Sequence, residues 1–238
     1  MTAPVSSTRI QVWDLPLRLF HWLLAAAVAV AFISAKVGGN AMVWHGRAGL
    51  AVIGLIVFRI IWGFIGSTHA RFANFVRGPS AIRAYLRGEW NGLGHNPLGA
   101  LSVLVLITLF ALEATTGLFA NDDISYQGYL YALVGADLSS RLTGIHKLFE
   151  PAMIGLVALH LAAIAYYLRV KKHNLAIPMV TGWKEVSDPT IATADSARGG
   201  GLVAFVVALL IGIAAAYAAS GALLPPPAPA AAVETPNF

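Results

Sequence analysis

Residues 144–160 read GIHKLFEPAMIGLVALH, a segment that is apolar enough to lie in a membrane and that carries two histidines, His146 and His160. On an α-helix, side chains 14 residues apart project from nearly the same face and are separated by roughly 21 Å along the axis. The core of a bilayer is about 30 Å thick, so this helix presents imidazoles near both membrane edges. Such a helix could hold two stacked cofactors.

The composition indicates an integral membrane protein. Hydrophobic residues make up 58% of the 238 residues and charged residues 11%, and the mean hydropathy is +0.71. Soluble domains carry about 25% charged residues. The chain has no cysteine, which excludes disulfides, Cys-ligated iron–sulfur clusters and covalent c-type haem attachment. The net charge of +5 does not indicate nucleic-acid binding, because the basic residues lie at the ends of apolar segments, where membrane topology explains them.

Five apolar segments are long enough to cross a bilayer. We expect membrane-spanning helices over residues 15–35, 42–64, 97–120, 143–169 and 202–219, with a short interfacial helix near 80–87. The expected organisation is a polar N-terminal segment (1–12), which is disordered or interfacial, a four-helix membrane domain (13–185), a polar linker (186–200), an additional helix (201–220) and a Pro/Ala-rich tail (221–238).

The distribution of Lys and Arg predicts the orientation. With the N-terminus in the cytoplasm, only Lys36, Arg47, Arg141 and Lys147 of the 16 basic residues fall on the outer side. We therefore expect the N-terminus to be cytoplasmic. With five spans, the C-terminal tail lies outside.

Four of the seven histidines, His21, His45, His146 and His160, lie within or at the edges of apolar segments. Ionisable residues inside a membrane are costly and usually functional. Depth pairs His21 with His160 on the cytoplasmic side and His45 with His146 on the outer side. Two imidazoles from facing helices are typical axial ligands of a bundle-bound haem, so we predict two bis-His b haems.

Other polar residues lie near the ends of the spans. Arg18, Arg47 and Lys147 are placed to bind haem propionates at the membrane edges. His69, His95 and His173 fall in cytoplasmic connections and are interpreted as interfacial polar residues, with His95 as a possible cap for the third span. A structural zinc site is a poor alternative, because it gathers four close ligands whereas the two histidine pairs lie roughly 20 Å apart.

Two carboxylates in the apolar segments remain open to interpretation. Glu113 lies inside the third span, and Glu150 follows His146 by one turn. Glu113 either belongs to a proton path or is a neutral carboxyl bonded to a neighbouring helix. Glu150 either orients the region around His146 or faces an outer cavity. A haem-free proton channel or transporter could use these groups as a relay, but no inverted repeat or pair of broken spans supports it.

Several motifs give the chain a specific resemblance. Residues 12–22 read VWDLPLRLFHW, 44–49 WHGRAG, 58–64 FRIIWGF and 94–99 GHNPLG, and His146 and His160 follow in Gly-Ile-His and Leu-His contexts. Together these motifs resemble the bacterial cytochrome b561 family, which includes the b-type cytochrome subunits of nickel–iron hydrogenases. The resemblance covers about residues 10–185, and the fifth span lies outside the four-helix pattern.

The resemblance implies an all-α, four-transmembrane-helix, haem-binding bundle in the bacterial cytoplasmic (inner) membrane. The family's haem ligands correspond to His21, His45, His146 and His160, and its members carry electrons between the quinone pool (ubiquinone or menaquinone) and a redox partner. That partner would be a c-type cytochrome or a hydrogenase or dehydrogenase subunit. One branch of the family is similar to a superoxide:ubiquinone oxidoreductase, which would act as a single chain.

Overall fold

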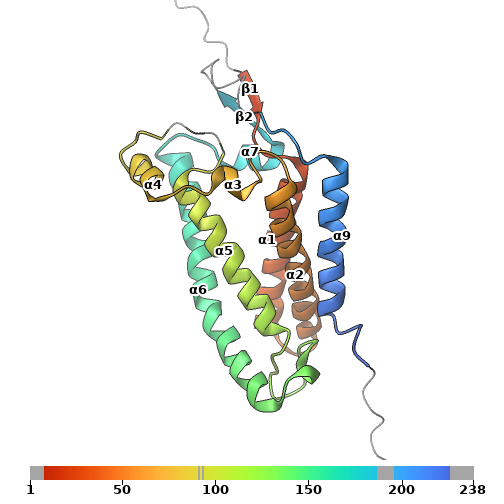
Figure 1. Ribbon diagram of the computed structural model, residues 1–238. Helices are drawn as coiled ribbons and strands as arrows, with labels where there is room; N and C mark the ends of the chain where they lie inside the picture. Colours follow the sequence, from red (N-terminus) through yellow and green to blue (C-terminus); the bar gives the residue numbers. More distant parts are fainter. Residues whose placement is uncertain (1–7, 91, 93, 187–195, 226–238) are drawn as a thin grey trace, which may run out of the picture.

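Five long helices run side by side in the computed structural model, which describes residues 8–90, 92, 94–186 and 196–225 (Figure 1). They are α1 (Leu15–Val37), α2 (Met42–Ile65), α5 (Pro97–Gly117), α6 (Ala136–Arg169) and α9 (Gly201–Ala219). Each is long and apolar enough to cross a membrane. The predicted all-α integral membrane fold with a fifth C-terminal helix is confirmed.

Local sequence signals determine where the helices begin and end. Asp14 caps α1, because its Oδ1 accepts a hydrogen bond of 2.6 Å from the Leu17 amide. Asn96 caps α5 in the same way, with 2.7 Å between its Oδ1 and the Gly99 nitrogen. A proline follows each cap in the first turn, where its missing N–H is not needed.

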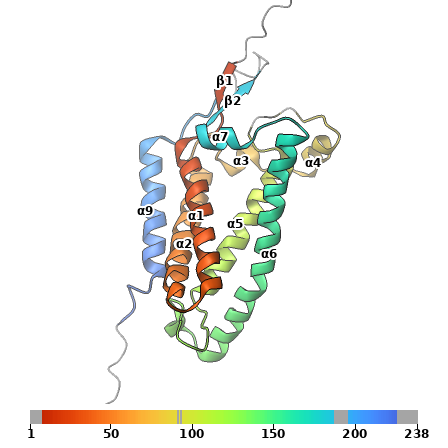
Figure 2. The same ribbon diagram turned by 180° about the vertical axis from the view of Figure 1, so that it is seen from behind.

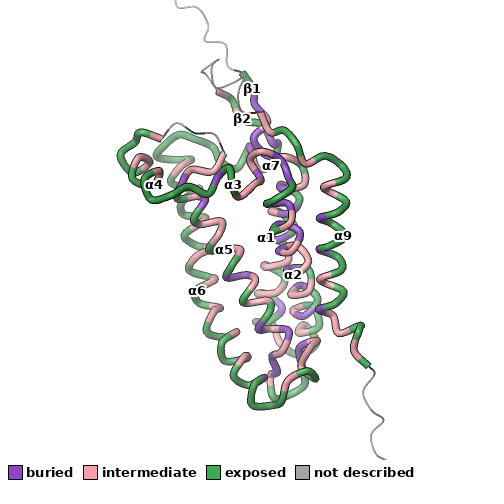
Figure 3. The backbone as a smooth tube through the Cα atoms, in the orientation of Figure 1, coloured by how far each residue is buried: buried purple, intermediate pink, exposed green. Residues whose placement is uncertain are grey.

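The central helix of the bundle is α2, which packs against α1, α5 and α9, while α5 in turn packs against α6. Figures 1 and 2 show α5 and α6 on one side of the α1–α2 pair and α9 on the other. Buried residues are concentrated along α1 and α2, whereas α6 is mostly exposed or half-buried (Figure 3). The exposed faces carry large apolar side chains, as expected where lipid replaces water.

One end of the bundle carries short elements from distant parts of the chain. Strand β1 (Thr8–Gln11) pairs antiparallel with β2 (Trp183–Val186), and Thr8 lies opposite Val186. The short helices α3 (Phe72–Phe75), α4 (Pro79–Leu86) and α7 (Ala176–Thr181) lie at the same end (Figure 1). Residues 8–11 are therefore not disordered, and an interfacial position of this segment stays a prediction. We call this end of the bundle the ribbon end.

The opposite end carries the turn η1 (Gly39–Ala41) and the α5–α6 connection, which includes η2 (Tyr131–Leu133). We call it the loop end. Here α6 begins at Ala136, seven residues earlier than expected. Its buried Ser139 receives a hydrogen bond of 2.7 Å from Asn121 Nδ2 and donates one of 2.7 Å to the Phe119 carbonyl. These contacts attach an additional stretch of helix to the connection.

The remaining boundaries agree with the expected spans within three residues. Three predicted segments lie largely outside the described residues, namely residues 1–7 of the N-terminal segment, most of the polar linker over 186–200 and most of the Pro/Ala-rich tail over 221–238. The interfacial helix expected near 80–87 corresponds to α4.

The backbones of α2 and α9 approach each other closely at Gly54 and Gly212. A Cβ added at Gly212 would lie 2.7 Å from the Gly54 carbonyl oxygen, which cannot move without displacing α2. We expect Gly212→Val to destabilise the protein by about 1–3 kcal/mol, measured as a lower midpoint of thermal unfolding in detergent. Gly155→Val is the matched control, because it lies at an exposed position where a Cβ would meet nothing within 4 Å. Equal unfolding temperatures for the two variants would contradict this role of Gly212.

Candidate functional site

The structure brings the four intramembrane histidines together as two pairs. His21 of α1 faces His160 of α6 with ring centroids 6.4 Å apart, at the ribbon end. His45 of α2 faces His146 of α6 with centroids 5.9 Å apart, at the loop end. These are the partners that depth and spacing predicted, and we call them the ribbon-end pair and the loop-end pair.

The separation within each pair suits one metal ion between two imidazoles. Metal–imidazole bonds of about 2.0–2.1 Å on both sides place two facing ring centres about 6.4 Å apart. Among the described residues, no group of three or more histidine or carboxylate side chains could hold a metal ion by itself. Two axial imidazoles are the protein's share of a metal site in which a macrocycle provides the remaining ligands.

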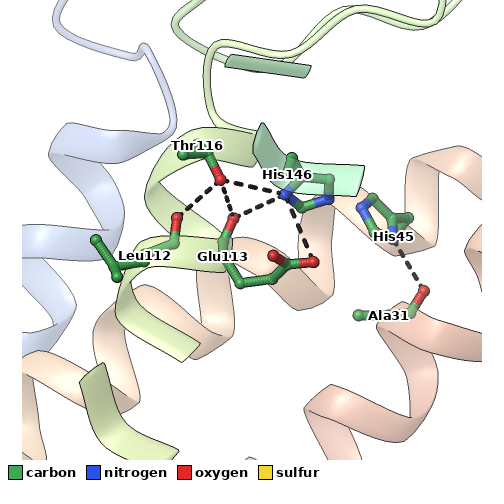
Figure 4. Close-up of polar contacts among 6 residues, drawn as sticks. All are labelled: Ala31, His45, Leu112, Glu113, Thr116 and His146. Carbon is green, nitrogen blue, oxygen red and sulfur yellow. Dashed lines mark hydrogen bonds and ion pairs between the residues drawn. The ribbon is translucent and has the colours of Figure 1, made fainter. Parts of the chain in front are cut away.

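Hydrogen bonds at the loop-end pair orient both rings for such a bond (Figure 4). The Nδ1 atom of His45 lies 2.9 Å from the Ala31 carbonyl oxygen, and Nδ1 of His146 lies 2.9 Å from the Glu113 carbonyl oxygen. A carbonyl only accepts, so each Nδ1 carries the proton and each Nε2 keeps its lone pair. Metal-binding histidines commonly have this arrangement.

The ribbon-end pair has a different polar environment. Nδ1 of His21 is buried and has no hydrogen-bond partner, and the His21 ring packs edge-on against Trp22 with centroids 5.0 Å apart. His160 is half-buried on α6.

The helix backbones leave room for a flat group between the paired rings. Although α6 carries one histidine of each pair, its backbone does not pack closely against either α1 or α2. Beside His45, a Cβ added at Gly49 would meet no heavy atom within 4 Å. The donor set, the ring separations and this backbone spacing all fit a b haem at each pair.

The three basic residues predicted to bind propionates lie in different environments. Arg18 donates from Nη1 to the Val180 carbonyl at 2.5 Å, and its Nε is buried without a partner. Arg47 is exposed, with its guanidinium 5.1 Å from the Trp44 ring centre. Lys147 is exposed. Propionate binding by these three residues stays a prediction.

The two carboxylates occupy different positions near the loop-end pair. Glu113 is mostly buried, with Oε1 3.8 Å from His146 Nδ1 and with Oε2 lacking a partner. Glu150 forms an ion pair with Lys36 and thereby connects α6 to the last turn of α1. Glu113 is thus placed beside a histidine of a neighbouring helix, and Glu150 ties two helices together near the same membrane edge.

The sequence interpretation missed two buried groups at the ribbon end. Arg59 was counted only as a cytoplasmic charge, yet it is 1% exposed within α2. His95 does not cap α5, since Asn96 does. Its ring packs against Trp13 and Phe75, with centroids 4.5 and 4.8 Å away. The signal for Arg59 was its position inside the apolar FRIIWGF motif.

The model of a protein family, described as prokaryotic cytochrome b561, matches residues 12–182. A probable Ni/Fe-hydrogenase B-type cytochrome subunit of Azotobacter chroococcum is 27% identical over 224 residues, covering 76% of this chain and 90% of the relative. Its counterpart in Azotobacter vinelandii is 25% identical with the same coverage. The probable Ni/Fe-hydrogenase 1 B-type cytochrome subunit of Escherichia coli K12 is 24% identical over 46% of this chain and 62% of the relative. No solved structure matches the chain.

Burial of His95 predicts a pH dependence of stability. Burial, followed by the positive charge of Arg59, lowers the pKa of His95 from 6.5 to about 3. Below pH 6.5 the unfolded chain therefore binds a proton that the folded chain does not. We expect His95 to remove up to about 1.4 kcal/mol of stability per pH unit as the pH falls below 6.5.

Thermal unfolding between pH 5 and 8 measures this effect. His95→Gln should unfold with a shallower pH dependence than the unmodified protein, whereas His173→Gln, at an exposed position, should keep the original slope. Identical slopes for all three proteins would show that His95 is not buried in its neutral form.

Proposed function

The chain belongs to the prokaryotic cytochrome b561 family, and we propose that it carries electrons within the membrane between the quinone pool and a redox partner through two b haems. The observation that supports this proposal most strongly is the presence of two imidazole pairs at the separation that one metal ion requires. Membership of the family implies a membrane protein that transfers electrons with haem b.

In this proposal His21 and His160 bind one haem and His45 and His146 bind the other. A bound b haem supplies reversible one-electron chemistry. With two imidazoles holding each haem, the iron would serve electron transfer rather than the binding of a small ligand. The hydrogen bonds from Nδ1 of His45 and His146 to backbone carbonyls hold these rings in the ligating tautomer.

The helix α6 determines the spacing between the two sites. His146 and His160 are 14 residues apart, which corresponds to roughly 21 Å along the axis and about 40° around it. The surrounding apolar side chains keep water away and lower the local dielectric constant, which is how a protein tunes a redox potential. One end of α6 would exchange electrons with quinone or quinol and the other with the partner.

The relatives' names favour a relay over a self-sufficient enzyme. The Azotobacter and Escherichia coli relatives are described as probable hydrogenase cytochrome subunits. By analogy, we propose a hydrogenase or dehydrogenase subunit, or a c-type cytochrome, as the partner, and ubiquinone or menaquinone as the mobile carrier. The helix α9, which the family match does not include, is available as a docking element.

The proposed location is the bacterial cytoplasmic membrane, with a cytoplasmic N-terminus. This orientation rests on the Lys/Arg bias and places the ribbon end, with β1 and β2, on the cytoplasmic side. The loop end would then face outward, and with it the loop-end pair.

Removal of single ligands tests the assignment of the two haems. We expect His21→Ala and His160→Ala to lose the same b haem, and His45→Ala and His146→Ala to lose the other, because one axial ligand cannot retain its haem at full occupancy. Redox-titrated visible spectra of the purified proteins, together with haem quantification, measure this. His173→Ala should retain both haems. Loss of the same haem in His21→Ala and His146→Ala would contradict the pairing.

The alternative function, a superoxide:ubiquinone oxidoreductase complete in one chain, has its own test. If the chain is a relay, the isolated protein should reduce ubiquinone with superoxide no faster than the uncatalysed reaction does. Quinone absorbance under a steady supply of superoxide measures the rate. Catalysed reduction that disappears in His45→Ala would favour the single-chain enzyme over the relay.

A further inference from the structure

Arg59 is a buried positive charge, and none of the residues that the structure describes bonds to its terminal nitrogens. The residue is 1% exposed, and neither Nη1 nor Nη2 has a hydrogen-bond partner. Its guanidinium lies 4.8 Å from the ring centre of Phe72 and 5.7 Å from that of Phe75. A buried and unpaired charge costs several kcal/mol unless an anion satisfies it. Two buried, unbonded terminal nitrogens fit a carboxylate, which arginine binds in a bidentate manner.

The negative charge of Asp14 acts on Arg59, but neither terminal nitrogen of Arg59 is bonded to it. Its Oδ1 accepts from the Leu17 amide at 2.6 Å, and its Oδ2 accepts from Trp62 Nε1 at 3.0 Å. Both carboxylate oxygens thus already hold the start of α1 and the indole of α2. Nη1 and Nη2 of Arg59 are therefore left available to a second anion.

Helical geometry places Arg59 about 6 Å nearer the ribbon end than His21. It follows His45 by 14 residues on α2, the same interval that separates His146 from His160 on α6. The side chain therefore lies on nearly the same face as His45, roughly 21 Å nearer the ribbon end. The bond between Trp62 and Asp14 fixes the level of α2 against α1. Measured from that level toward the middle of the membrane, Arg59 lies about 4.5 Å deeper and His21 lies about 10.5 Å deeper.

A second donor lies beside Arg59. The His95 ring packs on Phe75, and the Arg59 guanidinium also lies against Phe75. The buried Nδ1 of His95 has no hydrogen-bond partner. The charges of Arg59 and His21 both act on His95. Arg59, His95 and His21 therefore form one buried neighbourhood at the ribbon end, with donors that face no protein acceptor.

We propose that Arg59 binds the carboxylate of a haem propionate at the ribbon-end pair, with His95 as a second hydrogen-bond donor. The inference rests on the proposed binding of haem by His21 and His160. It replaces Arg18 as the main anion-binding residue at this end, because Nη1 of Arg18 is engaged by the Val180 carbonyl whereas both terminal nitrogens of Arg59 are available.

The midpoint potential of the ribbon-end haem tests this role. A positive charge favours the reduced and more electron-rich state of a nearby redox group. Arg59→Gln should therefore lower the midpoint potential of the ribbon-end haem, identified through His21→Ala, and leave that of the loop-end haem unchanged. The affinity of the protein for the ribbon-end haem should fall by about 10- to 100-fold, as expected for the loss of a hydrogen bond to a charged group.

Three further variants separate charge from packing. Arg59→Lys keeps the charge and should restore most of the potential. Arg59→Met keeps an apolar stem against Phe72 and should behave like Arg59→Gln, although the haem-free protein should unfold at a higher temperature because a buried charge is gone. Arg83→Gln makes the same substitution at an exposed site on α4 and should leave both haems unaltered.

Several results would overturn the inference while leaving the proposed function intact. One is an unchanged ribbon-end potential and haem content in Arg59→Gln, and another is an Arg59→Met protein that matches the unmodified one. If Arg59→Gln does not assemble, Arg59→Lys and Arg59→Met are compared instead. Equal ribbon-end midpoint potentials in these two variants would contradict a role for the positive charge. An unmodified protein without haem would overturn the proposed function as well.

Discussion

The desolvation of imidazoles inside an apolar bundle constrains this protein more than any other feature. Four histidines lie in spans that otherwise offer them few polar partners, and such groups are costly unless they are bonded. The fold offsets this cost by pairing each histidine of α6 with one from α1 or α2. In addition, Nδ1 of His45 and of His146 each donates a hydrogen bond to a backbone carbonyl. A metal at Nε2 would satisfy the second nitrogen of His45 and His146, whereas Nδ1 of His21 still lacks a partner.

The arrangement of the helices follows from the same constraint. A compact bundle would bring α6 against α1 and α2, but within the described residues the backbone of α6 packs closely against α5 and not against α1 or α2. The stable packing is instead provided by α1, α2 and α9, where Gly54 and Gly212 allow the backbones to approach. The packing of α1, α2 and α9 thus resembles an ordinary membrane helix interface. In contrast, α6 is separated from α1 and α2 by a distance that its side chains span.

The sequence predicted the spans and the pairing of the histidines because both depend on local periodicity, hydropathy and charge bias, which operate within one helix at a time. It did not predict the β1–β2 ribbon, since Thr8 and Val186 are neighbours only after the chain has folded. It also missed the burial of Arg59, which requires Phe72 and Phe75 from another segment to cover the guanidinium. The early start of α6 depends on Asn121 and Ser139 in the same non-local way.

The central claim is that one chain binds two b haems, each between two imidazoles. The most direct measurement is the ratio of b haem to protein in the purified chain, combined with the electron paramagnetic resonance spectrum of its oxidised form. The account predicts two haems per chain, both low-spin, as expected when both axial positions are occupied by imidazole. A ratio of one or zero, or a high-spin haem with an open axial position, would contradict it.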